Sequence, residues 1–316
     1  MASEASRGDG IVATLAELVA CRPDRRGGGF APGGRVTTHR AGGHRSAFSG
    51  RGMEFDESRV YRAGDDVLAI DWRVTARTGT VHTKLFHEER ERPVAVLADL
   101  RPGMRFGTRR RFKSVLAAHV ASLLSWTAVD GGDRLGGFLL GARGLRAFPA
   151  ARGRGGLLRW LKAVADATVP DDGPDEGPSL ALALRRLRAA ARPGTLAFVI
   201  SDFADLDDGA EAEFAHLARH SHVTAVLVHD RLERTLPARG DCRVSDGTDA
   251  LALGRLTKAE RRAWESAFER RRARLETLSR GRGTGFLALA TDAEPADVLH
   301  PRVARPGAAR TGGATA

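Results

Sequence analysis

The stretch Pro93-Val94-Ala95-Val96-Leu97-Ala98-Asp99 decides the fold of this chain. It is a continuous apolar run that ends in an acidic residue, which is typical of a parallel strand buried on both faces. A helix is expected next, because apolar residues recur at helical spacing over residues 112–124 until Gly131 and Gly132 end the pattern.

The same alternation continues toward the C-terminus. Further strands are predicted at residues 134–140, 195–200, 223–228 and 285–290, and further helices at 155–167, 180–191, 210–220 and 257–278. Strands of about six residues that alternate with helices of ten or more predict an α/β fold with a doubly wound, mostly parallel sheet. A short hairpin is expected within residues 241–253.

The composition changes on the N-terminal side of Pro93. A short helical pattern at residues 11–20 is followed by a Gly-rich stretch, and residues 54–91 are dense in charge with short alternating pieces that predict small antiparallel strands. We therefore expect three regions. They are an N-terminal helix with Gly-rich loops and a β-rich appendage (1–92), the doubly wound domain (93–304) and a disordered tail (305–316).

Composition narrows the function classes. Cys21 and Cys242 are the only cysteines of the 316 residues, and no stretch has the roughly twenty apolar residues of a bilayer span, so we expect a cytoplasmic protein. The net charge of +11 favours an acidic partner. However, Ala, Gly and Arg are abundant enough for a GC-rich genome to explain this excess, and the aromatic residues do not interleave with Arg as in single-strand binders. These features argue against nucleic-acid binding.

Two acidic residues follow predicted strands and should meet at one edge of the sheet. Asp99 ends the first core strand and Asp202 follows the strand at 195–200. Ligands of open α/β sheets bind outside the carboxyl ends of the strands, so this edge is the candidate binding site. Five basic residues lie just beyond Asp99 and could face an acidic partner: Arg105, Arg109, Arg110, Arg111 and Lys113.

Several blocks resemble the bacterial DUF58 family over roughly residues 46–299. They are Gly50-Arg51-Gly52-Met53-Glu54-Phe55, Arg59-Val60-Tyr61-Arg62-Ala63-Gly64-Asp65-Asp66, Ile70-Asp71-Trp72, Ser201-Asp202-Phe203 and residues 223–233. The sheet layout in turn resembles a von Willebrand factor A domain. In the first blocks we expect structural roles, with Trp72 as an apolar anchor, for Gly52, Glu54, Phe55, Arg59, Tyr61, Gly64, Asp65, Asp66, Asp71 and Trp72.

The von Willebrand factor A resemblance implies a divalent cation held by Asp-x-Ser-x-Ser, a later Thr and a later Asp. This sequence departs from that pattern, because Arg101 and Gly103 stand at the two serine positions and Pro178, with Ser179 beside it, stands at the Thr position. We therefore expect no cofactor and a lost metal site of which only Asp99 and Asp202 remain. Arg101 either neutralises one of these acids in place of the metal or points to solvent.

The resemblance implies a non-enzymatic, protein-binding adaptor that works with a MoxR-type AAA+ ATPase in the assembly or maturation of a client complex. The expected partner-binding edge consists of Asp99, Arg101, Gly103, Ser179, Ser201 and Asp202. No Gly-x-Ser-x-Gly nucleophile motif is present, and no catalytic residue is assigned.

Two alternatives remain open. The first is a nucleic-acid-binding protein that uses the Arg excess. The second is a metal-dependent hydrolase centred on the acid-rich appendage, in which carboxylates and imidazoles could assist hydrolysis. Its candidate residues are Glu54, Asp65, Asp66, Asp71, His82, His87, Glu88 and Glu89. Nearby basic residues come close to balancing their charge, which favours a network of ion pairs and turn caps instead.

Overall fold

The computed structural model of this chain describes residues 10–23, 30, 53–62, 65, 67–88, 93–170, 177–237, 243–245, 250–281 and 283–298. The chain divides into two compact units. The sheet unit comprises Met1–Gly33 and Arg92–Ala316, and the hairpin unit comprises Gly34–Glu91. The predicted tail at 305–316 lies outside the described residues.

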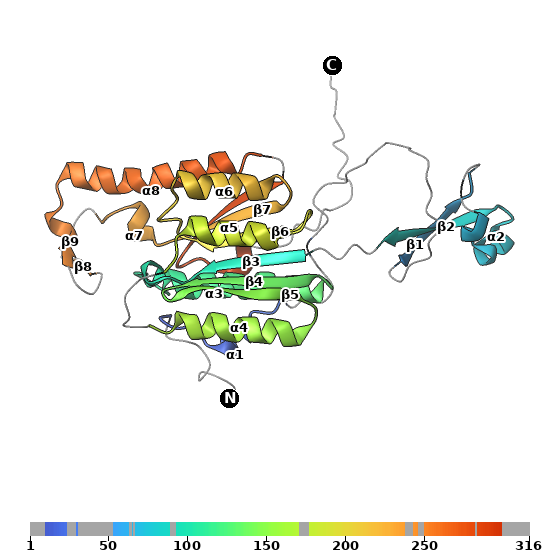
Figure 1. Ribbon diagram of the computed structural model, residues 1–316, viewed down its shortest axis with the longest axis horizontal. Coiled ribbons are helices and arrows are strands. Elements are labelled where there is room, and N and C mark those ends of the chain that lie inside the picture. Colours follow the sequence, from blue (N-terminus) through green and yellow to red (C-terminus); the bar gives the residue numbers. More distant parts are fainter. Residues whose placement is uncertain are drawn as a thin grey trace, which may run out of the picture. The chain divides into compact units, whose positions relative to one another are not determined.

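The sheet unit is built on a six-stranded, mostly parallel sheet (Figure 1). Its strands are β3 (Pro93–Asp99), β4 (Arg134–Gly141), β5 (Gly144–Ala151), β6 (Leu196–Ser201), β7 (His222–His229) and β10 (Thr284–Ala290). They lie in the order β10-β7-β6-β3-β4-β5, and only the β4–β5 pair is antiparallel. The structure thus confirms the predicted α/β class with a central, mostly parallel sheet.

The edge strand β5 is absent from the sequence prediction. Its residues Gly144-Leu145-Arg146-Ala147-Phe148-Pro149-Ala150-Ala151 contain a proline and form no continuous apolar run. An edge strand has one free side, so it tolerates proline and needs less apolar burial than a central strand. Its pattern is therefore too weak to predict a strand.

Helices cover both faces of the sheet. Helices α1 (Leu15–Ala20), α3 (Lys113–Asp130) and α4 (Arg154–Thr168) pack on one face, and α5 (Leu180–Ala190), α6 (Asp208–Ala218) and α8 (Lys258–Leu278) pack on the other (Figure 1). Along β3, Val94, Val96 and Ala98 join the first core, whereas Ala95 and Leu97 join the second. This alternation is why β3 is apolar at nearly every position.

Helix α1 belongs to the sheet unit, although the sequence analysis placed residues 1–92 in one N-terminal region. Thr14 and Glu17 form a capping box at its start, and Leu18 is fully buried. The carbonyl oxygen of Leu18 accepts hydrogen bonds from Ser122 Oγ and Trp126 Nε1 of α3. Because Leu18 of α1 is buried and bonded to α3, the N-terminal residues belong to the sheet unit and not to the hairpin unit.

The smaller elements of the sheet unit lie in its connections and after its last strand. They are η2 (Pro102–Met104), α7 (Arg231–Arg234), β8 (Arg243–Ser245), β9 (Ala250–Ala252), η3 (Leu253–Arg255) and α9 (Pro295–Val298). Strands β8 and β9 pair antiparallel, which confirms the predicted hairpin within residues 241–253.

The hairpin unit pairs β1 (Met53–Val60) antiparallel with β2 (His82–Glu88) and carries η1 (Val67–Ala69) and α2 (Trp72–Thr78) between them. The predicted small antiparallel strands are confirmed, but Trp72 is not an internal anchor, because its side chain is 68% exposed. The reason is local. Asp71 turns inward to cap α2, and the next residue of a helix points about 100° away.

Candidate functional site

The carboxyl ends of β3 and β6 lie side by side at the point where the sheet connections diverge. From β3 the chain continues to β4 on one side, and from β6 it continues to β7 on the other. Open α/β sheets bind ligands at such a switch point. We call this region the rim, and it comprises the strand ends and the turns after them, with Asp99, Arg101, Ser201, Asp202 and Asp205.

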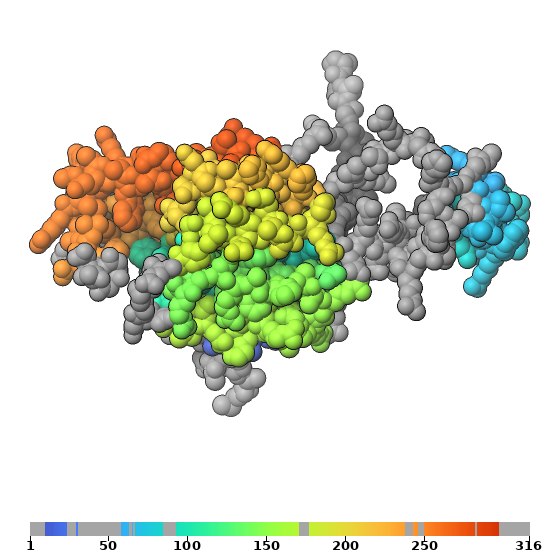
Figure 2. All heavy atoms as spheres, viewed as in Figure 1, coloured from blue at the N-terminus to red at the C-terminus, as the bar shows by residue number. Residues whose placement is uncertain are grey.

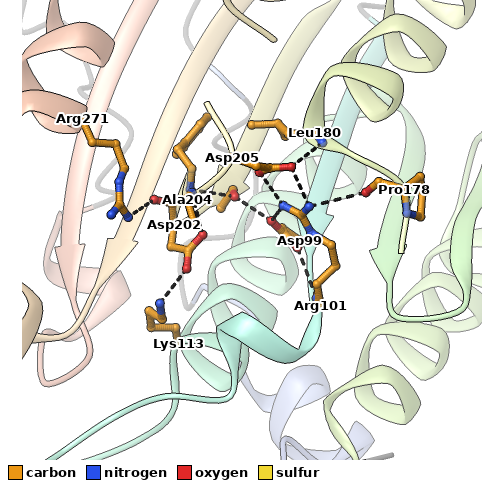
Figure 3. Close-up of polar contacts among 11 residues, drawn as sticks. Asp99, Arg101, Lys113, Pro178, Leu180, Asp202, Ala204, Asp205 and Arg271 are labelled. Atoms are coloured by element: carbon orange, nitrogen blue, oxygen red, sulfur yellow. Dashed lines mark hydrogen bonds and ion pairs between the residues drawn. The ribbon is translucent and has the colours of Figure 1, made fainter. Parts of the chain in front are cut away.

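Arg101 points inward and lies between two carboxylates (Figure 3). Its Nε and Nη2 donate to Asp99 Oδ1 and Oδ2 at 3.0 and 2.7 Å. Its Nη1 and Nη2 donate to Asp205 Oδ2 and Oδ1 at 2.7 and 2.8 Å. Of the two orientations expected for Arg101, the structure therefore has the one in which its guanidinium neutralises rim acids.

Asp205 is the second acid of this bridge, and the sequence analysis missed it in favour of Asp202. The turn after β6 explains why. Phe203 is fully buried and has a φ of 53°, a left-handed conformation that is uncommon for a residue other than glycine. This turn brings Asp205 back to the rim, where its Oδ2 also accepts the Leu180 backbone N–H at 2.9 Å. Residue spacing alone contains no signal for such a turn.

Asp202 has a different cation as its partner. Lys113 Nζ lies 2.6 Å from Asp202 Oδ2 and 2.9 Å from Glu233 Oε1, and all three side chains are largely buried (Figure 3 shows the contact with Asp202). Arg271 of α8 donates to the Asp202 backbone carbonyl at 2.9 Å. Lys113 therefore connects α3 to the turns after β6 and β7, and it is not part of a basic surface for an acidic partner.

A third buried acid lies at the end of β7. Asp230 accepts hydrogen bonds from Thr108 N, Thr108 Oγ1 and Thr291 Oγ1 at 2.9, 2.7 and 2.6 Å. These bonds tie the loop before α3 to the ends of β7 and β10. The neighbouring parallel strands β3, β6 and β7 are thus each followed or ended by a buried acid that other side chains of the unit satisfy.

Burial and pairing act on the rim charges in opposite directions. Burial raises the pKa of Asp99, which Arg101 and the Ser201 hydroxyl oppose by hydrogen bonding to the carboxylate. Burial also acts to raise the pKa of Asp205, but the hydrogen bonds from Arg101 and the Leu180 N–H outweigh it, and the pKa is lowered. The difference follows from exposure, because Asp99 is fully buried whereas the Asp205 side chain is 35% exposed.

Several residues of the expected partner-binding edge are inaccessible. Asp99 and Ser201 are 0% exposed and Asp202 is 5% exposed, so their side chains cannot contact a partner in this conformation. Gly103 and Ser179 are exposed, and the Arg101 side chain is 14% exposed. The reason is the internal pairing itself, which requires the acids to turn inward. The accessible part of the rim is formed by Gly103, Ser179 and the outer edges of Arg101 and Asp205.

Two described acids of the hairpin unit, Asp71 and Asp65, have structural partners. Asp71 caps α2 by accepting from the backbone N–H groups of Arg73 and Val74, and it accepts from Ser58 Oγ at 2.8 Å. Asp65 pairs with Arg59 at 2.8 Å. Within the described ranges, no three His, Cys, Asp or Glu side chains gather as metal ligands. Gly52, Gly64, Asp66 and Glu89, and the side chains of Glu54, Phe55, His87 and Glu88, lie outside those ranges.

The described cysteine, Cys21, shows no sign of a reactive site. Burial raises the pKa of the Cys21 thiol to about 11, so this thiol is protonated near neutral pH. Cys242 lies outside the described residues. Among the helices that the structure describes, none has both the length and the apolar character needed to cross a bilayer.

Comparisons with known proteins place the chain in a family context. The family model described as "Protein of unknown function DUF58" matches residues 57–274. Uncharacterized proteins of Mycobacterium tuberculosis (strain ATCC 25618 / H37Rv) and Mycobacterium bovis (strain ATCC BAA-935 / AF2122/97) are each 32% identical over 252 residues. In both cases the match covers 79% of this chain and 78% of the relative.

Solved structures show a weaker likeness. The conserved hypothetical protein BatB from Bacteroides thetaiotaomicron is 14% identical, with a TM-score of 0.39 and coverage of 63% of this chain and 90% of its own. Proximal thread matrix protein 1 from the mussel byssus is 15% identical, with a TM-score of 0.31 and coverage of 44% and 38% respectively.

Proposed function

The chain belongs to the DUF58 family, and from that premise we propose that its sheet unit is a von Willebrand factor A-like module that serves as a non-enzymatic, protein-binding adaptor. The six-stranded sheet with helices on both faces supports this assignment, as do the acids at the adjacent ends of β3 and β6. The family resemblance favours a MoxR-type AAA+ ATPase as the partner and the cytoplasm as the location.

One observation carries the proposal, namely the guanidinium of Arg101 held between Asp99 and Asp205. Hard divalent cations need several oxygen ligands, commonly six or more for Ca²⁺. The residues of this chain do not fit that need. Arg101 and Gly103 replace the two hydroxyls, and both carboxylates already accept hydrogen bonds from a group of fixed positive charge. Arg101 thus takes the place of the cation and holds the rim in one shape.

The bonding of the rim acids also supports a binding role over a catalytic one. A general acid or base must be able to exchange a proton with a bound substrate. Asp99, Asp202 and Asp230 are buried and accept hydrogen bonds from Arg101, Lys113 and Thr291 respectively. A preformed surface with its charges already compensated is suited to recognising the shape of a partner.

The partner would dock on the accessible part of the rim, around Gly103 and Ser179. Gly103 allows a clean test, because a Cβ added there meets nothing within 4 Å. Gly155 offers a matched control, since it is equally unobstructed at the start of α4. Gly155 comes just after Ala151, the last residue of β5, which pairs with Leu135 at the start of β4. Gly155 therefore lies toward the amino ends of the parallel strands, opposite the rim.

The experiment is affinity capture from the native host with added nucleotide, using the wild-type chain, Gly103→Arg and Gly155→Arg. The proposal predicts that a MoxR-type AAA+ ATPase copurifies with the wild type and with Gly155→Arg, and that Gly103→Arg recovers about tenfold less of it. Equal recovery by Gly103→Arg would show that the rim is not the docking surface. Capture of RNA or ribosomal proteins alone would contradict the adaptor role.

A further inference from the structure

An apolar groove runs between α5 and the β4–β5 hairpin, on the flank of the sheet. Its volume is about 760 Å³, and its walls include Val94, Phe138, Leu145, Leu182 and Leu187. Figure 2 shows the neighbouring surfaces of α5, in yellow-green, and of β4 and β5, in green. A groove of this size is large enough to receive several side chains of a ligand.

The groove exists because one helix layer is incomplete. On the opposite face, Trp160 of α4 packs against Phe148 of β5, with ring centroids 5.3 Å apart, and a Cβ at Gly137 would lie 2.5 Å from its ring. On the groove face, the described helices end with α5, and Leu145 and Ala147 of β5 line the groove. Leu145 also packs against the apolar cluster to which α5 contributes. Sheets of this class are stable when helices cover both faces.

The wall of the groove carries one uncompensated charge. Helix α5 has three arginines near its middle, and two of them pair with Glu213: Arg185 at 3.1 Å and Arg188 at 2.8 Å. Arg186 is exposed and is the charged residue that lines the groove. Among the described residues it has no hydrogen bond or ion pair. An occupant of this groove should therefore be apolar along its length and anionic where it meets Arg186.

We propose that the groove binds an amphipathic α-helix of a partner protein, with its apolar stripe on β4 and β5 and a carboxylate against Arg186. Such a helix would lie beside α5 and complete the layer, in the manner of helix-in-groove recognition. An extended peptide is disfavoured, because Pro149 removes a backbone donor from the free edge of β5. The groove adjoins the accessible rim at Pro178, but Gly103, Arg101 and Asp205 do not line it. This inference does not depend on the function proposed above.

The test uses the full chain and two fluorescent, helix-forming peptides of about 16 residues, a length of about 24 Å. Both carry leucines at positions i, i+3, i+4 and i+7, and the stripe is flanked by glutamates in one and by lysines in the other. Fluorescence anisotropy measures binding to the wild type, to Arg186→Glu and to Arg159→Glu. Arg159 is the matched control, because it is exposed on α4 and does not line the groove.

The wild type and Arg159→Glu should bind the glutamate peptide about tenfold tighter than the lysine peptide, and Arg186→Glu should reverse this preference. Leu182→Asp, at a side chain that is already 39% exposed, should weaken the binding of both peptides. If Arg186→Glu is misfolded by circular dichroism, Arg186→Gln should simply abolish the preference.

Three results would overturn the proposal. One is that neither peptide binds the wild type more tightly than about 100 µM. Another is that the preference for glutamate survives in both Arg186 variants. The third is that dodecanoate binds in an Arg186-dependent manner while the peptides do not, which would identify a small carboxylate as the occupant.

Discussion

The rim and the hairpin unit are both rich in acids, yet their carboxylates are used differently. At the rim, Asp99 and Asp202 are buried and paired with Arg101 and Lys113. In the hairpin unit, Asp65 pairs with the partly exposed Arg59 and Asp71 caps a short helix. Removing one partner from a buried pair leaves a charge without water or counter-ion, whereas a surface pair contributes little. The two regions should therefore respond very differently to substitution.

The largest effect should come from Lys113→Met. This change leaves Asp202 and Glu233 without their shared cation in a buried setting, so we expect a loss of about 4 kcal/mol in the free energy of unfolding. Urea denaturation followed by tryptophan fluorescence measures it, since Trp126 and Trp160 are buried in this unit. Lys162→Met is the control, because its pair with Asp166 is exposed. Equal stability of the two variants would contradict the distinction between buried and exposed ion pairs.

Arg101→Met should lower the free energy of unfolding by about 3 kcal/mol at pH 7, because the buried Asp99 carboxylate loses the cation that compensates its charge. The loss should depend on pH. Without Arg101 the pKa of Asp99 rises further, so the folded state takes up a proton before the unfolded state does as the pH falls. The stability difference between the variant and the wild type should therefore shrink as the pH falls from 7 toward 3.8, the ordinary pKa of an aspartate. A deficit that is the same at pH 5 and pH 7 would show that Asp99 does not depend on Arg101 for charge compensation.

His229, at the end of β7, should make the stability of the sheet unit sensitive to mild acid. Its burial, together with Arg234 and Arg272, lowers its pKa to about 4 against the opposing effect of Asp230 and Asp292. Between about pH 6.5 and about pH 4 the unfolded state binds a proton that the folded state does not, so stability falls as the pH falls through this window.

Protonation of His229 should lower the free energy of unfolding by at most about 3 kcal/mol, since each pKa unit corresponds to about 1.4 kcal/mol. Urea midpoints measured across this range for the wild type and for His229→Gln will test it. The variant should show a flatter profile. Parallel profiles would mean that other groups carry the acid sensitivity.

The smallest effect should be in the hairpin unit, where Asp71→Ala removes the cap of α2 and the bond from Ser58. We expect a local loss of about 1 kcal/mol, the usual range for an N-cap. Faster amide hydrogen exchange in residues 73–79, with unchanged exchange in β3 and β6, would show it. If the wild type instead hydrolyses phosphate esters and Asp71→Ala abolishes the turnover, the hydrolase alternative replaces the adaptor role.

The parts of the fold that sequence alone predicted are those with a strong local pattern. The apolar runs of β3, β4, β6 and β7 indicate buried strands, because burial on both faces forces nearly every position to be apolar. Strand β10 lies at the edge of the sheet and is mostly half-buried, but its apolar run still indicates a strand. Strand β5 and helix α2 have no such pattern, since the first is a half-exposed edge and the second has only seven residues beginning at an exposed Trp72.

The candidate site was only half predictable for a related reason. Asp99 and Arg101 lie two residues apart after a strand, so their closeness follows from local geometry. Asp205 reaches the rim only through the left-handed turn at Phe203. Lys113 reaches Asp202 only through the packing of α3 on the sheet. Contacts that depend on tertiary packing and on one unusual backbone angle leave no trace in spacing or composition.

The central proposal is that the Arg101 guanidinium takes the place that a divalent cation has in von Willebrand factor A domains. Isothermal titration of the purified chain with millimolar Mn²⁺ tests it most directly, with Asp99→Asn as the control. The account predicts heats no larger than dilution for both proteins. A stoichiometric isotherm for the wild type that disappears in Asp99→Asn would mean that the rim binds metal and that Arg101 does not replace it.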